Sequence, residues 1–328
     1  MILAILAATA LGASASATTI PTHYEAGHFF ATPTTKTGQT LRLLVDTGGG
    51  GTGGMYWLAD KAAARLKLHT SSCSIHGYAL TVAAAPVFAT GQGVPAGIGP
   101  CGGKLMVNPG PYDHDGQLGA SYLGTRVWTF DYPGQQLRIE GSAWKPSPAA
   151  HSTPLGFQKN DAGAVVQYFP GIVVRVDGQP LDLLLDTGAT AHPTAQGAKA
   201  SGTATVDGMG VTSYITTSTL ERWHKAHPDW TTVEQGDDLF APRFVARLIR
   251  VPSLEIAGWS IGPVWFTERP DQAFHGKMAQ IMDKPPEGAI GGNALDHFVM
   301  TVDYPHATAW FTCVRGCVAA KVVATDAR

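Results

Sequence analysis

Charge is scarce in this chain. Only 15% of its 328 residues are charged, and 23 Lys and Arg nearly balance 25 Asp and Glu. Without a basic excess to neutralise phosphates, the composition gives no support to a nucleic-acid partner. The 44% of hydrophobic residues excludes a disordered or fibrous protein, because such chains bury too little apolar surface to fold.

Long hydrophobic runs are also lacking. No stretch reaches the roughly 18 uninterrupted apolar residues that a membrane span needs, so we expect no stable membrane anchor. The apolar run of residues 2–12 is followed by Ala15-Ser16-Ala17, a small-residue cleavage pattern. We therefore predict a signal peptide over residues 1–17 and a protein exported to the periplasm or the medium; a buried N-terminal helix is the alternative.

Cysteine is limited to four residues, an even number that favours disulfides in an exported chain. We predict the local pairs Cys73–Cys101 and Cys313–Cys317. There is no C-x-x-C, and His224 and His227 lack the Glu of an H-E-x-x-H motif. The sequence therefore indicates no metal site and no other cofactor.

Glycine and proline are abundant, at 39 and 22 residues, which favours short strands and turns over long helices. The chain also repeats itself. Residues 38–48 and 178–188 are identical at 8 of 11 positions, and residues 115–133 and 287–305 at 8 of 19. The two segments occur twice in the same order, which indicates a duplicated half-molecule; two copies are too few for a solenoid.

The local pattern predicts mostly strands. The apolar residues 41–45 and 181–185 predict buried strands, each as the second strand of a hairpin, and residues 127–130 and 299–302 predict two more. Two short helices are expected. One covers residues 59–68, and the other begins at the capping-box spacing of Ser218 to Glu221.

Each half carries Asp-Thr-Gly directly after an apolar strand, at residues 46–48 and 186–188. Two such strands could deliver Asp46 and Asp186 to one interface. Two carboxyl groups in contact cannot both ionise cheaply, so they share a proton and titrate as a pair. One then accepts a proton from water, while the other donates one to a carbonyl oxygen. A single Asp-Thr-Gly is more often a simple turn, but two in matched contexts point to this chemistry.

With these motifs the chain resembles the bilobal aspartic proteases of the pepsin and retropepsin type, as a bacterial-type secreted relative. The resemblance is specific at the repeated segments, where residues 117–119 and 289–291 match the family's apolar-apolar-Gly element. It implies a mainly β, pepsin-like acid protease fold of two related β-barrel-like lobes with a few short helices. We expect the N-terminal lobe over residues 18–144, a linker over 145–156 and the C-terminal lobe over 157–328.

The resemblance also implies roles for single residues. Asp46 and Asp186 would be the catalytic pair, and the residues Thr47, Gly48, Thr187 and Gly188 would support it. Pepsins carry Ser or Thr just after each Asp-Thr-Gly, whereas this chain has Gly49 and Ala189. Loss of a donor to the ionised form would raise the pair's lower pKa, so we expect an optimum at milder acidity than that of a gastric enzyme.

Two further features are ambiguous. Residues 258–262 match G-x-S-x-G, but strand-like segments flank Ser260, which favours a hairpin turn over a nucleophile elbow. Tyr78 could tip a flap over the cleft or be a plain strand residue.

The sequence thus predicts an aspartic endopeptidase that acts on a peptide or protein substrate, for which a monomer suffices. The alternatives are a secreted binding protein that kept the fold without activity and, less favoured, a Ser260 hydrolase.

Overall fold

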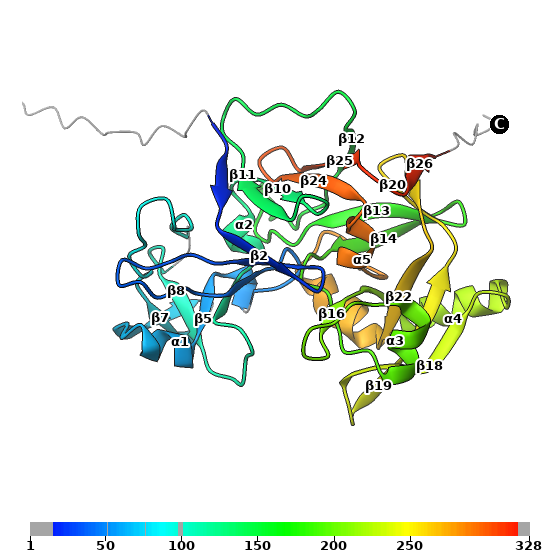
Figure 1. Cartoon of the computed structure of the whole chain (residues 1–328), viewed down its shortest axis with the longest axis horizontal. Helices are drawn as coiled ribbons and strands as arrows, with labels where there is room; N and C mark the ends of the chain where they lie inside the picture. The colour runs from blue at the N-terminus through cyan, green and yellow to red at the C-terminus, as the bar shows by residue number, and fades with distance from the viewer. Residues whose placement is uncertain (1–15, 51, 76, 98–100, 321–328) are drawn as a thin grey trace, which may run out of the picture.

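The computed structural model describes residues 16–50, 52–75, 77–97 and 101–320. Most of the predicted signal peptide therefore lies outside the described residues. The described chain is mainly β and forms two lobes on either side of a shared sheet, which confirms the predicted fold class (Figure 1). Among these residues, no helix is long and apolar enough to cross a bilayer.

The N-terminal lobe is one eight-stranded sheet. Its strands, in spatial order, are β2 (Thr22–Glu25), β3 (His28–Ala31), β4 (Leu43–Val45), β9 (Gly116–Leu118), β5 (Trp57–Ala59), β8 (Leu105–Asn108), β7 (Tyr78–Ala83) and β6 (Thr70–Ile75). Helices α1 (Asp60–Arg65) and α2 (Ala120–Leu123) and the 3-10 turn η1 (Thr52–Gly54) complete the lobe. Helix α1 lies within the predicted residues 59–68.

The C-terminal lobe contains a ten-stranded sheet. Its strands, in order, are β18 (Thr232–Phe240), β19 (Phe244–Val251), β22 (Val264–Arg269), β17 (Ser213–Thr216), β23 (Gly288–Ile290), β14 (Gln179–Leu185), β13 (Gly171–Val176), β20 (Leu254–Ile256), β21 (Trp259–Ile261) and β26 (Cys317–Ala319). The smaller elements are β15 (Thr190–Ala191), β16 (Gly210–Val211), α3 (Ala195–Ser201), α4 (Thr217–Ala226), α5 (Gly292–Leu295), the π-helical η2 (Gln272–Lys277) and the 3-10 turn η3 (Met278–Gln280).

The two sheets have the same topology over seven strands. The order β3-β4-β9-β5-β8-β7-β6 corresponds to β13-β14-β23-β17-β22-β19-β18, and every neighbouring pair has the same parallel or antiparallel sense in both lobes. The C-terminal copy is longer mainly in two places, around α3 and around η2. The repeat inferred from sequence is therefore a repeat of structure.

A six-stranded sheet joins the lobes. Its order is β1 (Thr18–Ile20), β11 (Gln136–Ile139), β10 (Val127–Asp131), β24 (Phe298–Asp303), β25 (Thr308–Cys313) and β12 (His151–Pro154). At its centre β10 pairs with β24, and Thr129 lies opposite Thr301, its equivalent in the repeat. Strand β12 falls within the predicted linker, so that segment is partly ordered by pairing with β25. Trp128, Phe130, Phe298 and Phe311 are fully buried in this region.

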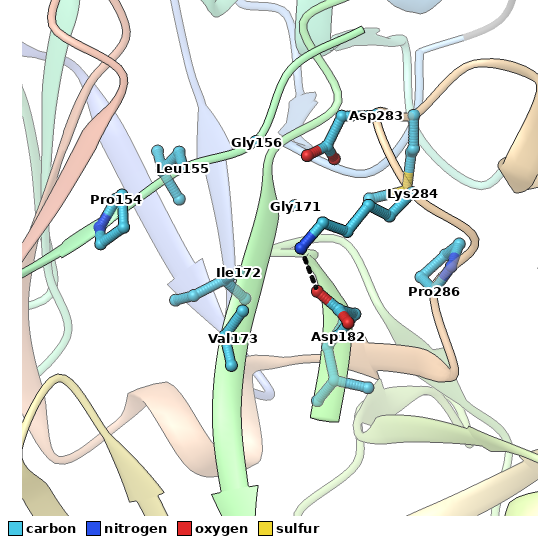
Figure 2. A pocket seen from close by; sticks show the side chains of 12 residues that line it. Pro154, Leu155, Gly156, Gly171, Ile172, Val173, Asp182, Asp283, Lys284 and Pro286 are labelled. Carbon is cyan, nitrogen blue, oxygen red and sulfur yellow. Dashed lines mark hydrogen bonds and ion pairs between the residues drawn. The ribbon is translucent and has the colours of Figure 1, made fainter. Parts of the chain in front are cut away.

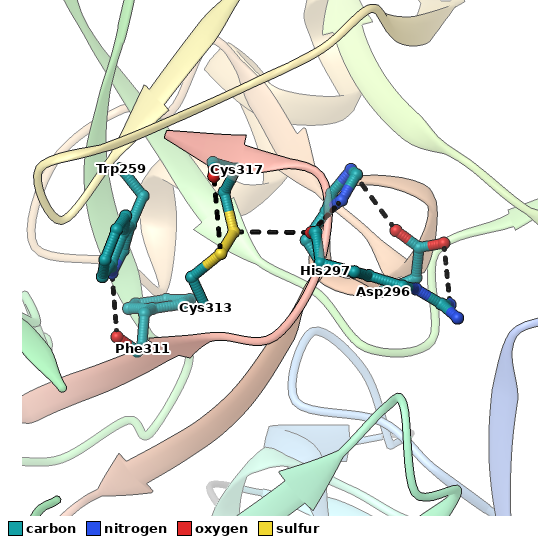
Figure 3. The surroundings of a disulfide bond; sticks show 7 residues. Trp259, Asp296, His297, Phe311, Cys313 and Cys317 are labelled. Atoms are coloured by element: carbon teal, nitrogen blue, oxygen red, sulfur yellow. Dashed lines mark hydrogen bonds and ion pairs between the residues drawn. A yellow bond between two sulfur atoms is a disulfide. The ribbon is translucent and has the colours of Figure 1, made fainter. Parts of the chain in front are cut away.

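Both predicted disulfides are present. Cys73 on β6 is joined to Cys101. Cys313 ends β25 and Cys317 begins β26, so the second disulfide ties the shared sheet to the C-terminal sheet. Nearby, the indole N–H of Trp259 donates to the main-chain oxygen of Phe311 at 3.0 Å (Figure 3).

One predicted helix start is wrong. Helix α4 begins at Thr217, and its N-cap is Thr216, whose hydroxyl accepts the N–H of Thr219. The capping-box spacing at Ser218 to Glu221 therefore lies inside the helix. Thr216 is the last residue of β17 and directly precedes the first turn of α4. Its hydroxyl can therefore accept a main-chain N–H of that turn, which makes Thr216 the N-cap.

Candidate active site

Asp46 and Asp186 each follow a central strand of their lobe, β4 and β14. Their main-chain N–H groups donate to the oxygens of Leu118 and Ile290, at 3.0 and 2.9 Å. Those acceptors belong to β9 and β23, the matched apolar-Gly segments of the sequence, which run parallel to β4 and β14. Each acidic loop is therefore anchored to its own sheet in the same way.

Thr47 and Thr187 join the two Asp-Thr-Gly loops by hydrogen bonds across the interface. The hydroxyl of Thr47 donates to the main-chain oxygen of Leu185 at 2.6 Å and accepts the N–H of Thr187 at 3.0 Å. The hydroxyl of Thr187 donates to the oxygen of Val45 at 2.8 Å and accepts the N–H of Thr47 at 3.1 Å. These four buried bonds form a nearly symmetric clasp directly beneath the acids.

The carboxyl groups of Asp46 and Asp186 hydrogen-bond each other. One oxygen of each also accepts the N–H of the glycine two residues later, Gly48 at 2.8 Å and Gly188 at 3.0 Å. Each glycine also lies directly against the aspartate of the other lobe. A Cβ on Gly188 would lie 2.2 Å from Cγ of Asp46, so any side chain there would separate the pair.

The electrostatics agree with a shared proton. Both side chains are buried, with 8% of each residue exposed, and burial raises the pKa of Asp46 above its usual range. The pKa of Asp186 also lies well above its usual range, first because of burial and then because the neighbouring charge of Asp46 disfavours its ionised form. The two acids can therefore hold one proton between them and titrate as a pair.

Gln117 is a site residue whose role the sequence alone did not predict. Its side-chain N–H donates to Oδ2 of Asp46, and its side-chain oxygen accepts the indole N–H of Trp57 at 2.9 Å. This corrects the expectation that the first lobe lacks a donor at the outer carboxyl oxygen. A Cβ on Gly49 would lie 2.3 Å from that oxygen and 3.0 Å from the Gln117 nitrogen, so the amide fills the space beside Gly49.

The glycine-rich loop after Asp46 packs closely on α2. Gly50 has a φ of 113°, and a Cβ there would lie 2.4 Å from Cα of Gly119. The main-chain oxygen of Gly49 accepts the N–H of Ala120 at 3.0 Å. These glycines therefore allow main chain to pack against main chain. Gly51 lies outside the described residues.

A buried ion pair supports the loop after Asp186. Arg269 and Asp237 are 4% and 1% exposed, with Nη1 and Oδ1 3.3 Å apart. The guanidinium lies over the ring of Tyr214, whose hydroxyl donates to the main-chain oxygen of Thr190 at 2.6 Å. From the other lobe, Nε2 of His28 lies 3.1 Å from the hydroxyl of Thr190, and burial lowers the pKa of His28 to about 4.

The remaining sequence candidates lie elsewhere. Ser260 is on β21, which forms a hairpin with β20, so the strand–turn–helix context of a nucleophile elbow is absent there. Its hydroxyl lies 2.8 Å from that of Ser253. Tyr78 begins β7, beside the turn of the β6–β7 hairpin, and is 71% exposed. The described part of the chain has no cluster of three or more His, Cys, Asp or Glu side chains that could hold a metal.

A separate cavity of about 250 Å³ lies on the C-terminal lobe, between β13, β14 and residues 282–286. Figure 2 shows the ion pair of Lys284 and Asp182 at its side, with nitrogen and oxygen 3.5 Å apart. Neither Asp46 nor Asp186 lines it.

Comparison with solved structures finds aspartic proteinase from Irpex lacteus, which is similar over 92% of this chain and 98% of that chain, at 12% identity and a TM-score of 0.48. Basic 7S globulin from soybean is similar over 91% of this chain and 95% of that chain, at 11% identity and a TM-score of 0.45. No family model matches the chain, and no curated protein matches it.

Proposed function

We propose that the protein is an aspartic endopeptidase, with Asp46 and Asp186 as its catalytic residues. The observation that carries the proposal is the pair of hydrogen-bonded carboxyl groups held at a two-fold interface by Thr47 and Thr187. A buried pair with one shared proton offers a base and an acid side by side, which is what the addition of water to an amide needs.

In the proposed mechanism a water molecule lies between the two carboxyl groups. The ionised carboxylate takes a proton from this water, and the oxygen attacks the scissile carbonyl carbon. The protonated partner gives its hydrogen to the carbonyl oxygen, so a neutral tetrahedral diol forms. Proton transfer to the amide nitrogen then releases both products, and no acyl-enzyme is made.

The substrate would be a peptide or an exposed segment of a protein, bound in extended form between the lobes with strand-like main-chain pairing. Both acids belong to one chain, so a monomer would be complete. Export is also part of the proposal, supported by the two disulfides.

Cleavage of a peptide library between about pH 3 and pH 7, the range in which a coupled carboxyl pair titrates, tests the activity. We expect cleavage that a statine-type inhibitor blocks and that Asp186→Asn abolishes. Asp182→Asn is the matched control, because Asp182 lies on the same strand, half exposed, and pairs with Lys284. If no peptide is cut but peptides of the library still bind, the protein is an inactive binding protein on the same fold. Cleavage undiminished in Asp186→Asn would refute the mechanism.

A further inference from the structure

We propose that Gln117 is a positioning residue that makes Asp46 the base of the pair and Asp186 the acid; this rests on the proposed peptidase function. Each hydrogen-bond donor to a carboxylate stabilises its ionised form. A donor to only one of the two acids therefore favours that acid as the base and leaves the other as the acid. In the structure that donor is the side-chain amide of Gln117.

The orientation of the Gln117 amide is fixed by Trp57. An indole N–H can only donate, so the amide must turn its oxygen toward Trp57. Its NH₂ group then faces Asp46 and cannot offer a lone pair to it. Strands β5 and β9 hold this arrangement, because Trp57 and Gln117 are directly opposite each other in their antiparallel pairing. Both side chains are buried, which strengthens the bond relative to one in water.

The second lobe lacks the equivalent arrangement. Tyr214 lies opposite Ala289 in the pairing of β17 and β23, as Trp57 lies opposite Gln117. Ala289 has no donor to offer, and the hydroxyl of Tyr214 is bonded to Thr190 instead. Asp186 therefore keeps its main-chain donors without a side-chain amide, whereas Asp46 has both kinds.

Other titratable groups also face the pair. His114 precedes β9, and its positive charge would lower the pKa of Asp46. Tyr304 lies near Asp46, while Tyr132 and Tyr214 lie near Asp186. These tyrosines are neutral at acidic pH, since the ordinary pKa of tyrosine is about 10 and burial raises the pKa of each further. Gln117, in contrast, hydrogen-bonds Asp46 and carries no charge that changes with pH.

The test is the pH profile of kcat/KM for Gln117→Met, which keeps the length of the side chain and removes the donor. We expect the acidic limb to move up by about one pH unit, since a hydrogen bond to a charged group of this kind corresponds to a shift of that size. Activity well below the limb should fall about tenfold, and activity at the optimum should change far less. An acidic limb that does not move would overturn the proposal.

Trp57→Phe provides a second variant, because the amide is then free to turn. We expect a smaller shift in the same direction, and no additional shift when the change is combined with Gln117→Met. Additive shifts would mean that Trp57 does not act through Gln117, and would overturn the proposal. Tyr112→Phe is the matched control. It keeps the ring, whose centroid lies 4.5 Å from that of Trp57, and removes a hydroxyl that accepts the side-chain N–H of Asn108.

A second readout separates this proposal from the function on which it rests. The ¹³C resonance of the Asp46 carboxyl group reports its titration without substrate. If the native protein cleaves no peptide, the peptidase proposal fails, yet an upward shift of this titration in Gln117→Met still supports the pairing of Gln117 with Asp46. If the native protein cleaves peptides and this titration does not change, Gln117 is not the positioning residue.

Discussion

Gly48 of one lobe is in contact with Asp186 of the other: a Cβ added to the glycine would lie 2.4 Å from Cγ of the aspartate. No real side chain tolerates that distance, so Gly48→Ala must push the two acids apart. We expect a loss of activity of about 100-fold or more, as displacements of about 1 Å in active sites produce.

The control for that loss is Gly97→Ala, where the new Cβ would meet Tyr122 at an ordinary 3.6 Å. Peptidase assays on both variants, with circular dichroism to verify folding, decide the point. Full activity in Gly48→Ala would mean that the acids need not be in contact.

The threonine clasp should contribute to stability as well as to geometry. Thr47→Val leaves the N–H of Thr187 and the oxygen of Leu185 without their partner in a buried interface. We expect the free energy of unfolding to fall by about 2–4 kcal/mol, from two unsatisfied buried groups. Thr47→Ser keeps the hydroxyl and should fall by much less. Urea denaturation measures both, and equal losses would show that the methyl group matters more than the hydrogen bonds.

The pair of acids should make stability depend on pH in a definite direction. The pKa of Asp186 is raised in the folded protein, whereas in the unfolded chain it is about 3.9. The folded state therefore binds a proton that the unfolded state has lost, and stability falls as pH rises above about 4.

Asp186→Asn removes this cost. At neutral pH we expect the variant to be more stable than the native protein, because an amide in this buried position neither ionises nor has to bind a proton that the unfolded chain has lost. The difference should vanish below about pH 3, where both states of the native protein are protonated. Thermal melts across pH test this, with Asp182→Asn as the half-exposed control. A variant less stable at neutral pH would contradict the raised pKa.

The ion pair of Arg269 and Asp237 should be costly to break. Arg269→Met leaves a buried carboxylate without its cation, and we expect a loss of about 3–5 kcal/mol in unfolding free energy. Arg269→Met combined with Asp237→Leu should recover much of it, since no charge then remains buried. Arg250→Met, on the exposed side of β19, is the control and should change little. Failure of the double variant to recover would show that packing against Tyr214 dominates.

The features that occur in both halves of the chain could be predicted from the sequence. Asp46 and Asp186 could be placed together because matched strands and matched apolar-Gly segments surround both. Gln117 is the first residue of one such segment. Its role depends on Trp57, which lies 60 residues away in the sequence and is brought opposite Gln117 by strand pairing. The single signal was a polar residue where the second copy has Ala289.

The helix start at Thr217 was mispredicted for a related reason. Several Thr and Ser residues in succession could each cap the helix, and the end of β17 decides among them. The pair of Arg269 and Asp237 leaves no local pattern, because two distant strands bring the residues together.

The difference between Gln117 and Ala289 has a consequence for how such a protein can evolve. In a homodimer every substitution is present in both subunits, so the two acids would always have the same neighbouring residues. When both copies lie in one polypeptide, that constraint is removed. A single codon change can then alter the surroundings of one acid and leave those of the other unchanged, so that the two acids can take different roles.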